Sequence, residues 1–287
     1  MTPIPIALST GSLYTYGIAR IFELAAQAGF DGVEVLMDHR WDGRHPAYLR
    51  RVSRDTGMPI VAVHNPFVPH VPGWPTDSLG RLRASAAVAR EVGARVVVAH
   101  LPMRMLAIKV ELFGARLKPL LLPVPWPLRD GDYRRLFLHD LPAFEAAEGV
   151  RVGVENMPAK HLLGFRVDFH AFNNLEALDG FPHLTLDTTH LATWGLDVVE
   201  IYRRWKGRVI HVHLSNFSGG REHLLPSRGQ VPVADLLRLL AEDEYPGSVS
   251  VELHPEALEA EDEGKVLAHL RRELAFCREM IALRASA

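Results

Sequence analysis

The chain has 287 residues, of which 48% are hydrophobic and 23% charged, as is usual for a globular protein with a sizeable core. Its formal net charge is −2, from 32 basic and 34 acidic side chains, so no overall electrostatic attraction draws it to nucleic acid or to anionic membranes. The single cysteine, Cys277, excludes an intrachain disulfide and any metal site built from several cysteines.

No stretch of the sequence has the pattern of a secretory signal or a membrane span. The opening residues, MTPIPIALST, lack a basic start and a long apolar run. The most apolar stretch, LKPLLLPVPWPL at 117–128, contains four prolines, which a membrane-spanning helix does not accommodate. We therefore expect a cytoplasmic protein without membrane contacts.

Short β-type runs alternate with helix-type segments along the whole chain. In chain order, the runs are IPIAL (4–8), GVEVL (32–36), PIVAVH (59–64), RVVVAH (95–100), RVGVE (151–155), LTLD (184–187), VIHVHL (209–214) and SVSVEL (248–253). Between them, segments such as 78–93 and 233–241 repeat apolar residues with the helical period. Cys277 continues the apolar spacing of Val266 and Leu270, which predicts a last helix with the cysteine on its packed face.

This alternation of strands and helices predicts a parallel sheet. Eight units in a chain of 287 residues predict a closed (β/α)8 barrel, and the lack of a linker-like break in composition predicts one domain over 1–287. An open, doubly wound sheet is disfavoured because STGSLYTYG, which follows the first run, does not match the glycine fingerprint of a dinucleotide site.

One connection is far longer than the others. About thirty residues, at about 101–131, separate the fourth strand from a helix expected to begin near Asp132. Loops of this length in a compact domain are usually functional or disordered, and its apolar, aromatic composition argues against disorder. Because the insertion leaves the strand directly after His100, we expect part of it to cover the barrel mouth and part to contact a second subunit in a homodimer.

Metal-capable side chains stand at the ends of six consecutive strands. Active sites of such barrels form at the C-terminal ends of the strands, so these side chains are expected to meet at one rim. In chain order they are His64, His100, Glu155, Asp187, His213 and Glu252.

Four of these residues, Glu155, Asp187, His213 and Glu252, come from neighbouring strands. Three carboxylates and one imidazole form a hard, oxygen-rich ligand set that suits Mn²⁺, Mg²⁺, Co²⁺ or Zn²⁺. Four further imidazoles favour Zn²⁺ or a second metal ion. These additional ligand candidates are His64, His100, His190 and His223.

Three other ionisable residues near the strand ends are not predicted to be metal ligands. Glu34, on the second strand, is expected to bond a neighbouring loop. His211 alternates with His213 and is expected to face the opposite side of its strand. His254 is expected to lie beyond the rim.

The motifs together resemble the xylose isomerase-like barrel superfamily, which includes sugar isomerases, ketose 3-epimerases and endonuclease IV. The resemblance covers essentially the whole chain and implies the same (β/α)8 fold. It rests on the order and spacing of AGFDGVEV (28–35), VHNPF (63–67), VGVENM (152–157), LTLDTTH (184–190), HVHLSN (211–216) and SVELHP (250–255).

The epimerase branch of this superfamily implies specific roles. The residues that match Glu155 and Glu252 act there as acid/base pair and as metal ligands, and those that match Asp187 and His213 complete the metal site. The position of His190 and a basic residue after the seventh strand contact the substrate. Here that basic residue is either Arg221 or Arg228.

The endonuclease IV branch has a trinuclear zinc site, and eight residues of this chain match its ligand types. They are His64, His100, Glu155, Asp187, His190, His213, His223 and Glu252. The chain departs from that branch at Arg221, which replaces an aspartate two residues before the matching histidine. A cation there opposes a third zinc, and the chain has no clustered basic stripe for DNA.

The sequence therefore favours a metal-dependent isomerase or epimerase of a small polyhydroxy carbonyl compound, such as a sugar or sugar phosphate, that works through an enediolate. His64, His100, His190, Arg221 and Trp194 are candidate substrate contacts. Trp126, Trp194 and Phe67 are candidate apolar faces for a sugar ring. The alternatives are a zinc phosphodiesterase like endonuclease IV, or a metal-bound sugar-binding barrel without turnover.

Overall fold

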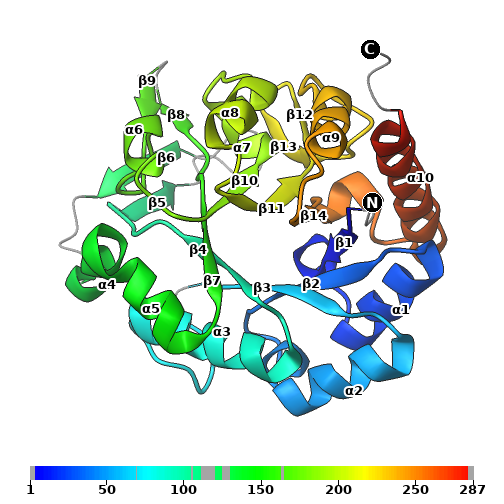
Figure 1. The fold of residues 1–287 in the computed structure, drawn as a ribbon, viewed down its shortest axis with the longest axis horizontal. Coiled ribbons are helices and arrows are strands. Elements are labelled where there is room, and N and C mark those ends of the chain that lie inside the picture. Colours follow the sequence, from blue (N-terminus) through cyan, green and yellow to red (C-terminus); the bar gives the residue numbers. More distant parts are fainter. Residues whose placement is uncertain are drawn as a thin grey trace.

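The computed structural model describes residues 4–68, 70–104, 106–110, 120–124, 130–162 and 165–283. Eight parallel strands close into a barrel with the helices outside it, in the order β1-β14-β11-β10-β7-β4-β3-β2 (Figure 1). The barrel strands are β1 (Ile6–Ser9), β2 (Gly32–Leu36), β3 (Ile60–His64), β4 (Val96–His100), β7 (Arg151–Glu155), β10 (Leu184–Asp187), β11 (Val209–Leu214) and β14 (Ser248–Val251). The predicted (β/α)8 barrel is confirmed, and each strand lies within two residues of its predicted bounds.

Helices connect the strands on the outside. They are α1 (Ile18–Ala28), α2 (Pro46–Thr56), α3 (Ser78–Val92), α4 (Gly131–Arg135), α5 (Leu141–Glu148), α6 (Leu175–Leu178), α7 (Thr188–Thr193), α8 (Val198–Trp205), α9 (Val233–Glu242) and α10 (Glu263–Ala282). Shorter turns are the 3-10 helices η1 (Thr10–Leu13), η2 (Asp42–Arg44) and η5 (Pro255–Leu258) and the π-helix η4 (Leu136–Asp140). The helix α3 ends at Gly93, whose φ of 81° lies in the left-handed region that glycine adopts without strain.

The hydrophobic core fills the space between strands and helices. On α10 the residues Val266, Leu270 and Cys277 are fully buried, which confirms the packed helix face predicted from their spacing. Alternate strand residues point into the barrel instead, and near the site several of these are polar and fully buried, among them Glu34, Thr185 and His211. The barrel interior therefore contains hydrogen-bonded polar side chains as well as packed apolar ones.

The long insertion after β4 is described in part. It contains an antiparallel pair, β5 (Leu106–Val110) and β6 (Leu120–Val124), which lies on the same side of the barrel as a second pair, β8 (Lys160–Leu162) and β9 (Phe165–Val167) (Figure 1). Before β5, Arg104 N–H donates to the carbonyl of Phe169 at 2.7 Å, and Met103 pairs with His170. Trp126 and the segments 111–119 and 125–129 lie outside the described residues, so the lid and the homodimer contact stay predictions.

None of the helices in the described part of the chain combines the length and the apolar character that a bilayer span requires.

Candidate metal centre and active site

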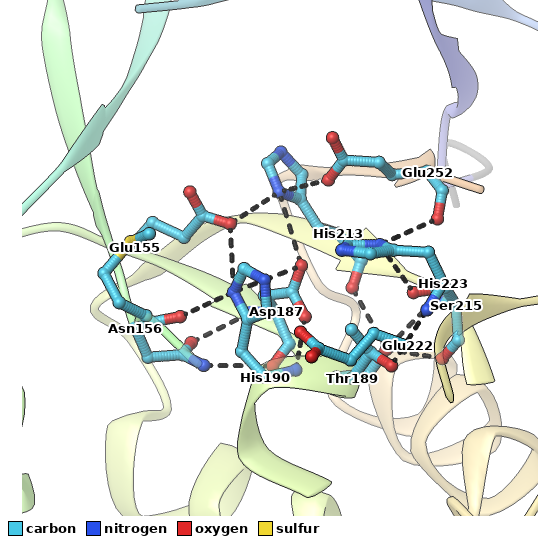
Figure 2. Close-up of polar contacts among 12 residues, drawn as sticks. Glu155, Asn156, Asp187, Thr189, His190, His213, Ser215, Glu222, His223 and Glu252 are labelled. Atoms are coloured by element: carbon cyan, nitrogen blue, oxygen red, sulfur yellow. Dashed lines mark hydrogen bonds and ion pairs between the residues drawn. The ribbon is translucent and has the colours of Figure 1, made fainter. Parts of the chain in front are cut away.

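Four side chains converge at the C-terminal end of the barrel (Figure 2). Glu155, Asp187 and His213 stand on β7, β10 and β11, and Glu252 directly follows β14. His213 Nδ1 lies 3.1 Å from Glu155 Oε1, 3.0 Å from Glu252 Oε2 and 3.7 Å from Asp187 Oδ2. One potential ligand atom from each of the four residues lies within 4.8 Å of the other three. The structure thus brings together the four residues predicted from strand ends.

The local fold explains the place of Asp187. It is the N-cap of α7, and its Oδ1 accepts a 2.7 Å hydrogen bond from His190 N–H. One oxygen is therefore used by the backbone, while Oδ2 is buried and has no hydrogen-bond partner in the described part of the chain. The same turn orients the His190 ring, whose Nδ1 lies 2.9 Å from the carbonyl oxygen of Asn156. An Nδ1–H that donates to this carbonyl leaves the other ring nitrogen of His190 as an acceptor.

The four additional histidines flank this group on two sides. His64 and His100 approach Glu155 Oε2 with their Nε2 atoms, at 3.6 and 2.9 Å, and their rings meet edge to face. His190 and His223 stack edge to face on the other side, with centroids 5.4 Å apart, and can share a metal position with Asp187. All four predicted additional histidines therefore surround the centre.

The electrostatics of the site favour a cation. Burial alone raises the pKa of a carboxyl group, yet the imidazoles of His213 and His100 hold the pKa of Glu155 well below its usual range. Burial acts on Glu252 in the same way, but His213 beside it lowers its pKa to about 2. The same imidazole is buried, but Glu34, Glu252 and Glu155 raise its pKa well above the ordinary value for histidine. Ionised carboxylates thus surround the buried ring of His213, an arrangement with the negative charge to hold a cation.

Two buried carboxylate oxygens show whether the site suits a metal ion. Glu155 Oε2 and Asp187 Oδ2 are both buried and make no hydrogen bond among the described residues, although His100 Nε2 lies within 2.9 Å of the former. Buried polar atoms without a partner are costly, whereas oxygen ligands at these positions suit a hard divalent ion. The residues present therefore fit the metal that the sequence predicts.

A cavity of about 380 Å³ opens over the centre, within the size range of small-molecule sites. His64, His100 and Glu155 form part of its wall, as do His190, His223 and Glu252. Apolar and aromatic residues contribute a second part of the lining, namely Leu36, Pro66, Phe67, Leu101, Met103, Tyr133, Met157 and Pro158. The polar residues Asn65, Ser78, Arg81, Asp130 and His170 complete it. A second cavity of about 390 Å³ adjoins it at Leu36, Phe67, His223 and Glu252 and is lined by Tyr14, Val68, Leu253 and Pro255.

Two predicted substrate contacts do not line the cavity. Arg221 is exposed on β13 (Arg221–Leu224), which pairs with β12 (Asn216–Ser218), and the alternative Arg228 is exposed as well. Trp194 turns its indole N–H to the carbonyl of Met157 at 2.9 Å, and the guanidinium of Arg166 covers its ring at 4.3 Å. Phe67, in contrast, is 62% exposed and forms part of both cavity walls.

The prediction for His211 is wrong. Residues two positions apart on a strand point to the same face, so His211 enters the barrel interior together with His213. There, Glu34 Oε2 lies 2.5 Å from His211 Nε2 and 3.1 Å from His213 Nε2. Glu34 therefore bonds these imidazoles and not a neighbouring loop. The HVH spacing of residues 211–213 predicts that both histidines lie on one face of the strand.

His254 lies past the end of β14, as predicted, where it caps η5 and is about half exposed. A further residue escaped the sequence analysis altogether. His170 lines the cavity from the loop after β9, and burial together with the nearby His100 and His190 lowers its pKa to about 3. No strand end marks this position, because the loop is held at the cavity by backbone pairing with the segment Pro102–Arg104.

Fold and site together define the class. The chain belongs to the xylose isomerase-like TIM barrel family, whose model matches residues 22–278. Uncharacterized proteins of Mycobacterium leprae and Mycobacterium tuberculosis are 29% and 30% identical to it, each over 96% of this chain and 97% of the relative.

Solved structures with the same fold include enzymes of different activities. An L-ribulose 3-epimerase superposes with a TM-score of 0.66 at 19% identity, over 98% of this chain and 95% of that one. An AP endonuclease of family 2 from Brucella melitensis has a TM-score of 0.65 at 16% identity, over 95% and 99%. A 3-keto-D-glucoside 4-epimerase from E. coli has a TM-score of 0.63 at 18% identity, over 96% and 100%. At these identities the likeness establishes the fold.

Proposed function

We propose that this protein is a divalent-metal-dependent isomerase or epimerase of a small polyhydroxy carbonyl compound, a sugar or sugar phosphate. The observation that carries the proposal is the placement of Glu155 and Glu252, which lie 3.1 and 3.0 Å from the same atom, His213 Nδ1, on different strands. Two carboxylates that approach one point from two strands suit the removal of a proton at one face of a carbon and its return at the other. The epimerases among the structural relatives support this reaction class.

Glu155, Asp187, His213 and Glu252 would hold the ion. When bound, a divalent ion polarises the carbonyl oxygen of the substrate and stabilises the charge that develops on it. Its identity among Mn²⁺, Zn²⁺, Mg²⁺ and Co²⁺ belongs to the proposal, and the surrounding imidazoles favour Zn²⁺ or a second metal ion.

The protein's own groups carry the proton transfers. One carboxylate takes the proton from the carbon next to the carbonyl, and the C–H electron pair enters the enediolate. The other carboxylate takes up a proton from solvent and delivers it to the carbon on the opposite face, or to the neighbouring carbon in an isomerisation, while the first carboxyl group releases its proton to solvent. Because the pKa values of Glu155 and Glu252 are held low without a bound ion, both are ionised and able to act as bases.

The remaining cavity residues orient the substrate. His64, His100 and His190 line the side next to Glu155 and present ring nitrogens to hydroxyl groups. Phe67 and Met157 form part of the apolar wall, which excludes water that would otherwise protonate the enediolate at random.

The test is carbon-bound hydrogen exchange. The metal-loaded protein is incubated in heavy water with ketoses, free and phosphorylated, and deuterium on carbon is measured by mass spectrometry. We expect incorporation with one of them and its loss in Glu252→Gln. The matched control is Glu256→Gln, which changes a 90% exposed side chain four residues away. Exchange by Glu252→Gln at the wild-type rate would remove Glu252 from the mechanism.

A second candidate is a zinc phosphodiesterase. It is supported by the separate groups His64–Glu155–His213 and Asp187–His190–His223, which offer positions for more than one ion, and by the endonuclease among the structural relatives. The net charge of −2 and the exposed Arg221 weigh against it. Three bound zinc ions and cleavage of an abasic-site duplex would favour it over the isomerase. A sugar-binding barrel without turnover is disfavoured because binding alone does not require two opposed carboxylates.

A further inference from the structure

A fully buried polar chain lies beneath the metal centre and is not used by the proposed reaction. It joins β2 and β11 across the barrel interior through Glu34 and His211, which are 177 residues apart in sequence. Glu34, His211 and His213 are all 0% exposed. Burying a carboxylate and two imidazoles costs free energy unless each of their polar atoms has a hydrogen-bond partner. The partners of these atoms therefore indicate what the group does.

The polar side-chain atoms of Glu34 and His211 all have hydrogen-bond partners. Glu34 Oε2 faces His211 Nε2 at 2.5 Å and His213 Nε2 at 3.1 Å, and Glu34 Oε1 accepts from Ser9 Oγ at 3.3 Å. His211 Nδ1 lies 2.8 Å from Ser248 Oγ at the other end. The polar side chains between these strands thus satisfy one another by hydrogen bonds.

The direction of these bonds follows from the chemistry of the groups. An ionised carboxylate only accepts hydrogen bonds, so both imidazoles that face Glu34 Oε2 present N–H groups to it. On His213 this places a proton on Nε2, so Nδ1 is the ring nitrogen left for a metal ion, which would displace a proton held there. Nδ1 faces the position surrounded by Glu155, Glu252 and Asp187, at 3.1, 3.0 and 3.7 Å.

We propose that Glu34 and His211 are positioning residues that fix His213 as the Nε2–H tautomer and so commit its Nδ1 to the divalent ion. His211 does this indirectly. Its N–H holds Glu34 Oε2 in place, and its own ring is held by Ser248. The inference rests on the metal centre of the proposed function and goes beyond it by assigning two buried residues that touch neither ion nor substrate.

A positioning role for Glu34 and His211 and a purely structural role have different measurable effects. A structural pair would affect folding in the presence and absence of metal alike. A positioning pair changes the metal affinity and the protonation pattern of one ring, because partners that orient metal-bound histidines typically contribute about 10- to 100-fold in affinity.

The first experiment measures affinity for Mn²⁺ and Zn²⁺ alone, by competition with a chelator. We expect about 10- to 100-fold weaker binding in Glu34→Gln, whose neutral amide oxygen accepts from the two imidazoles more weakly than an ionised carboxylate does. His211→Gln, which retains a donor for Glu34, is expected to bind more tightly than His211→Leu. The control is Ser250→Ala, which removes a buried barrel hydroxyl without a hydrogen-bond partner among the residues that the structure describes, and which should leave the affinity unchanged.

The second experiment needs no variant and so does not depend on folding of the variants. Long-range ¹H–¹⁵N correlation spectra of the zinc-loaded wild-type protein, labelled with ¹⁵N-histidine, report which ring nitrogen carries the proton. We expect His213 to be protonated at Nε2. A proton on Nδ1, or unchanged affinity in a folded Glu34→Gln protein, would overturn this inference alone. A wild-type protein that binds neither ion would overturn the metal centre and this inference with it.

Discussion

Asn156 and Asp187 are joined by two reciprocal hydrogen bonds. Asn156 Nδ2 donates to the carbonyl of Asp187 at 3.0 Å, and Asp187 N–H donates to Asn156 Oδ1 at 2.9 Å (Figure 2). Asn156 follows Glu155 directly, so these bonds fix the end of β7 against the end of β10. The distance between two candidate metal ligands, Glu155 and Asp187, is therefore set by a fully buried amide that does not itself face the ion.

Replacing this amide should weaken both the fold and the site. Asn156→Leu leaves the Asp187 N–H and carbonyl buried without partners, which we expect to lower the free energy of unfolding by about 2–4 kcal/mol. Denaturant unfolding in chelator measures this without metal. Metal affinity should fall as well, whereas Asn174→Ala, which removes only the N-cap of α6, should cost about 1 kcal/mol and leave metal binding intact. Equal metal affinity in both variants would contradict the role of Asn156.

Metal binding should stabilise the folded protein. A ligand that binds only the folded state adds about 2.7 kcal/mol at 100 times its dissociation constant, so the unfolding midpoint should rise with added Mn²⁺ or Zn²⁺ and fall in chelator. Asp187→Asn removes the charge of a buried ligand and should reduce this dependence strongly. A midpoint in wild type that is independent of metal would argue against the centre.

Cys277 should be inert in the native protein. Its side chain is fully buried on α10, and burial raises the pKa of the thiol, so the reactive thiolate is scarce. We expect a thiol reagent such as DTNB to label no cysteine in buffer and one cysteine per chain in denaturant. Rapid labelling of the native protein would show that α10 opens readily or packs differently.

Acid should remove a specific stabilising contact at Asp179. Hydrogen bonds from Arg204, Trp205 and Arg208 lower the pKa of this carboxyl from 3.8 to about 2, against the effect of burial. A carboxyl with a lower pKa in the folded state stabilises the fold above the unfolded pKa, and this contribution is lost as pH falls. The stability difference between wild type and Asp179→Asn should thus be full above about pH 4 and shrink toward pH 2. A difference constant over this range would exclude the ion pair as its source; Glu256→Gln serves as the exposed control.

The positions of the barrel strands and of most candidate site residues could be predicted from the sequence, because active sites in this fold form at the C-terminal ends of the strands. The runs at 151–155, 184–187 and 209–214 have the bounds predicted for them, and so Glu155, Asp187 and His213 reach the same rim. Periodicity places a side chain on the inner or outer face and, with the strand order, fixes its neighbours. Applied consistently, it also predicts that His211 faces inward.

The contacts that escaped prediction depend on features that periodicity does not encode. His170 reaches the cavity from an irregular loop, and Glu34 finds His211 across the width of the barrel. Arg221 was assigned from a resemblance, but the β12–β13 hairpin places it in solvent. The ring of Trp194 is covered by Arg166, a contact that no local pattern signals. Such relations depend on loop paths and on contacts between distant segments.

The seam of the barrel has a consequence for how the protein is made. β14 pairs with β1, the first strand, and Glu252 stands one residue beyond β14. A growing or truncated chain that ends before this point has an open sheet, three of the four candidate metal ligands and only one of the two carboxylates proposed to transfer protons. The proposed activity thus depends on closure of the ring: an unfinished chain is expected to be inert, and activity should begin only when the last strand docks against the first.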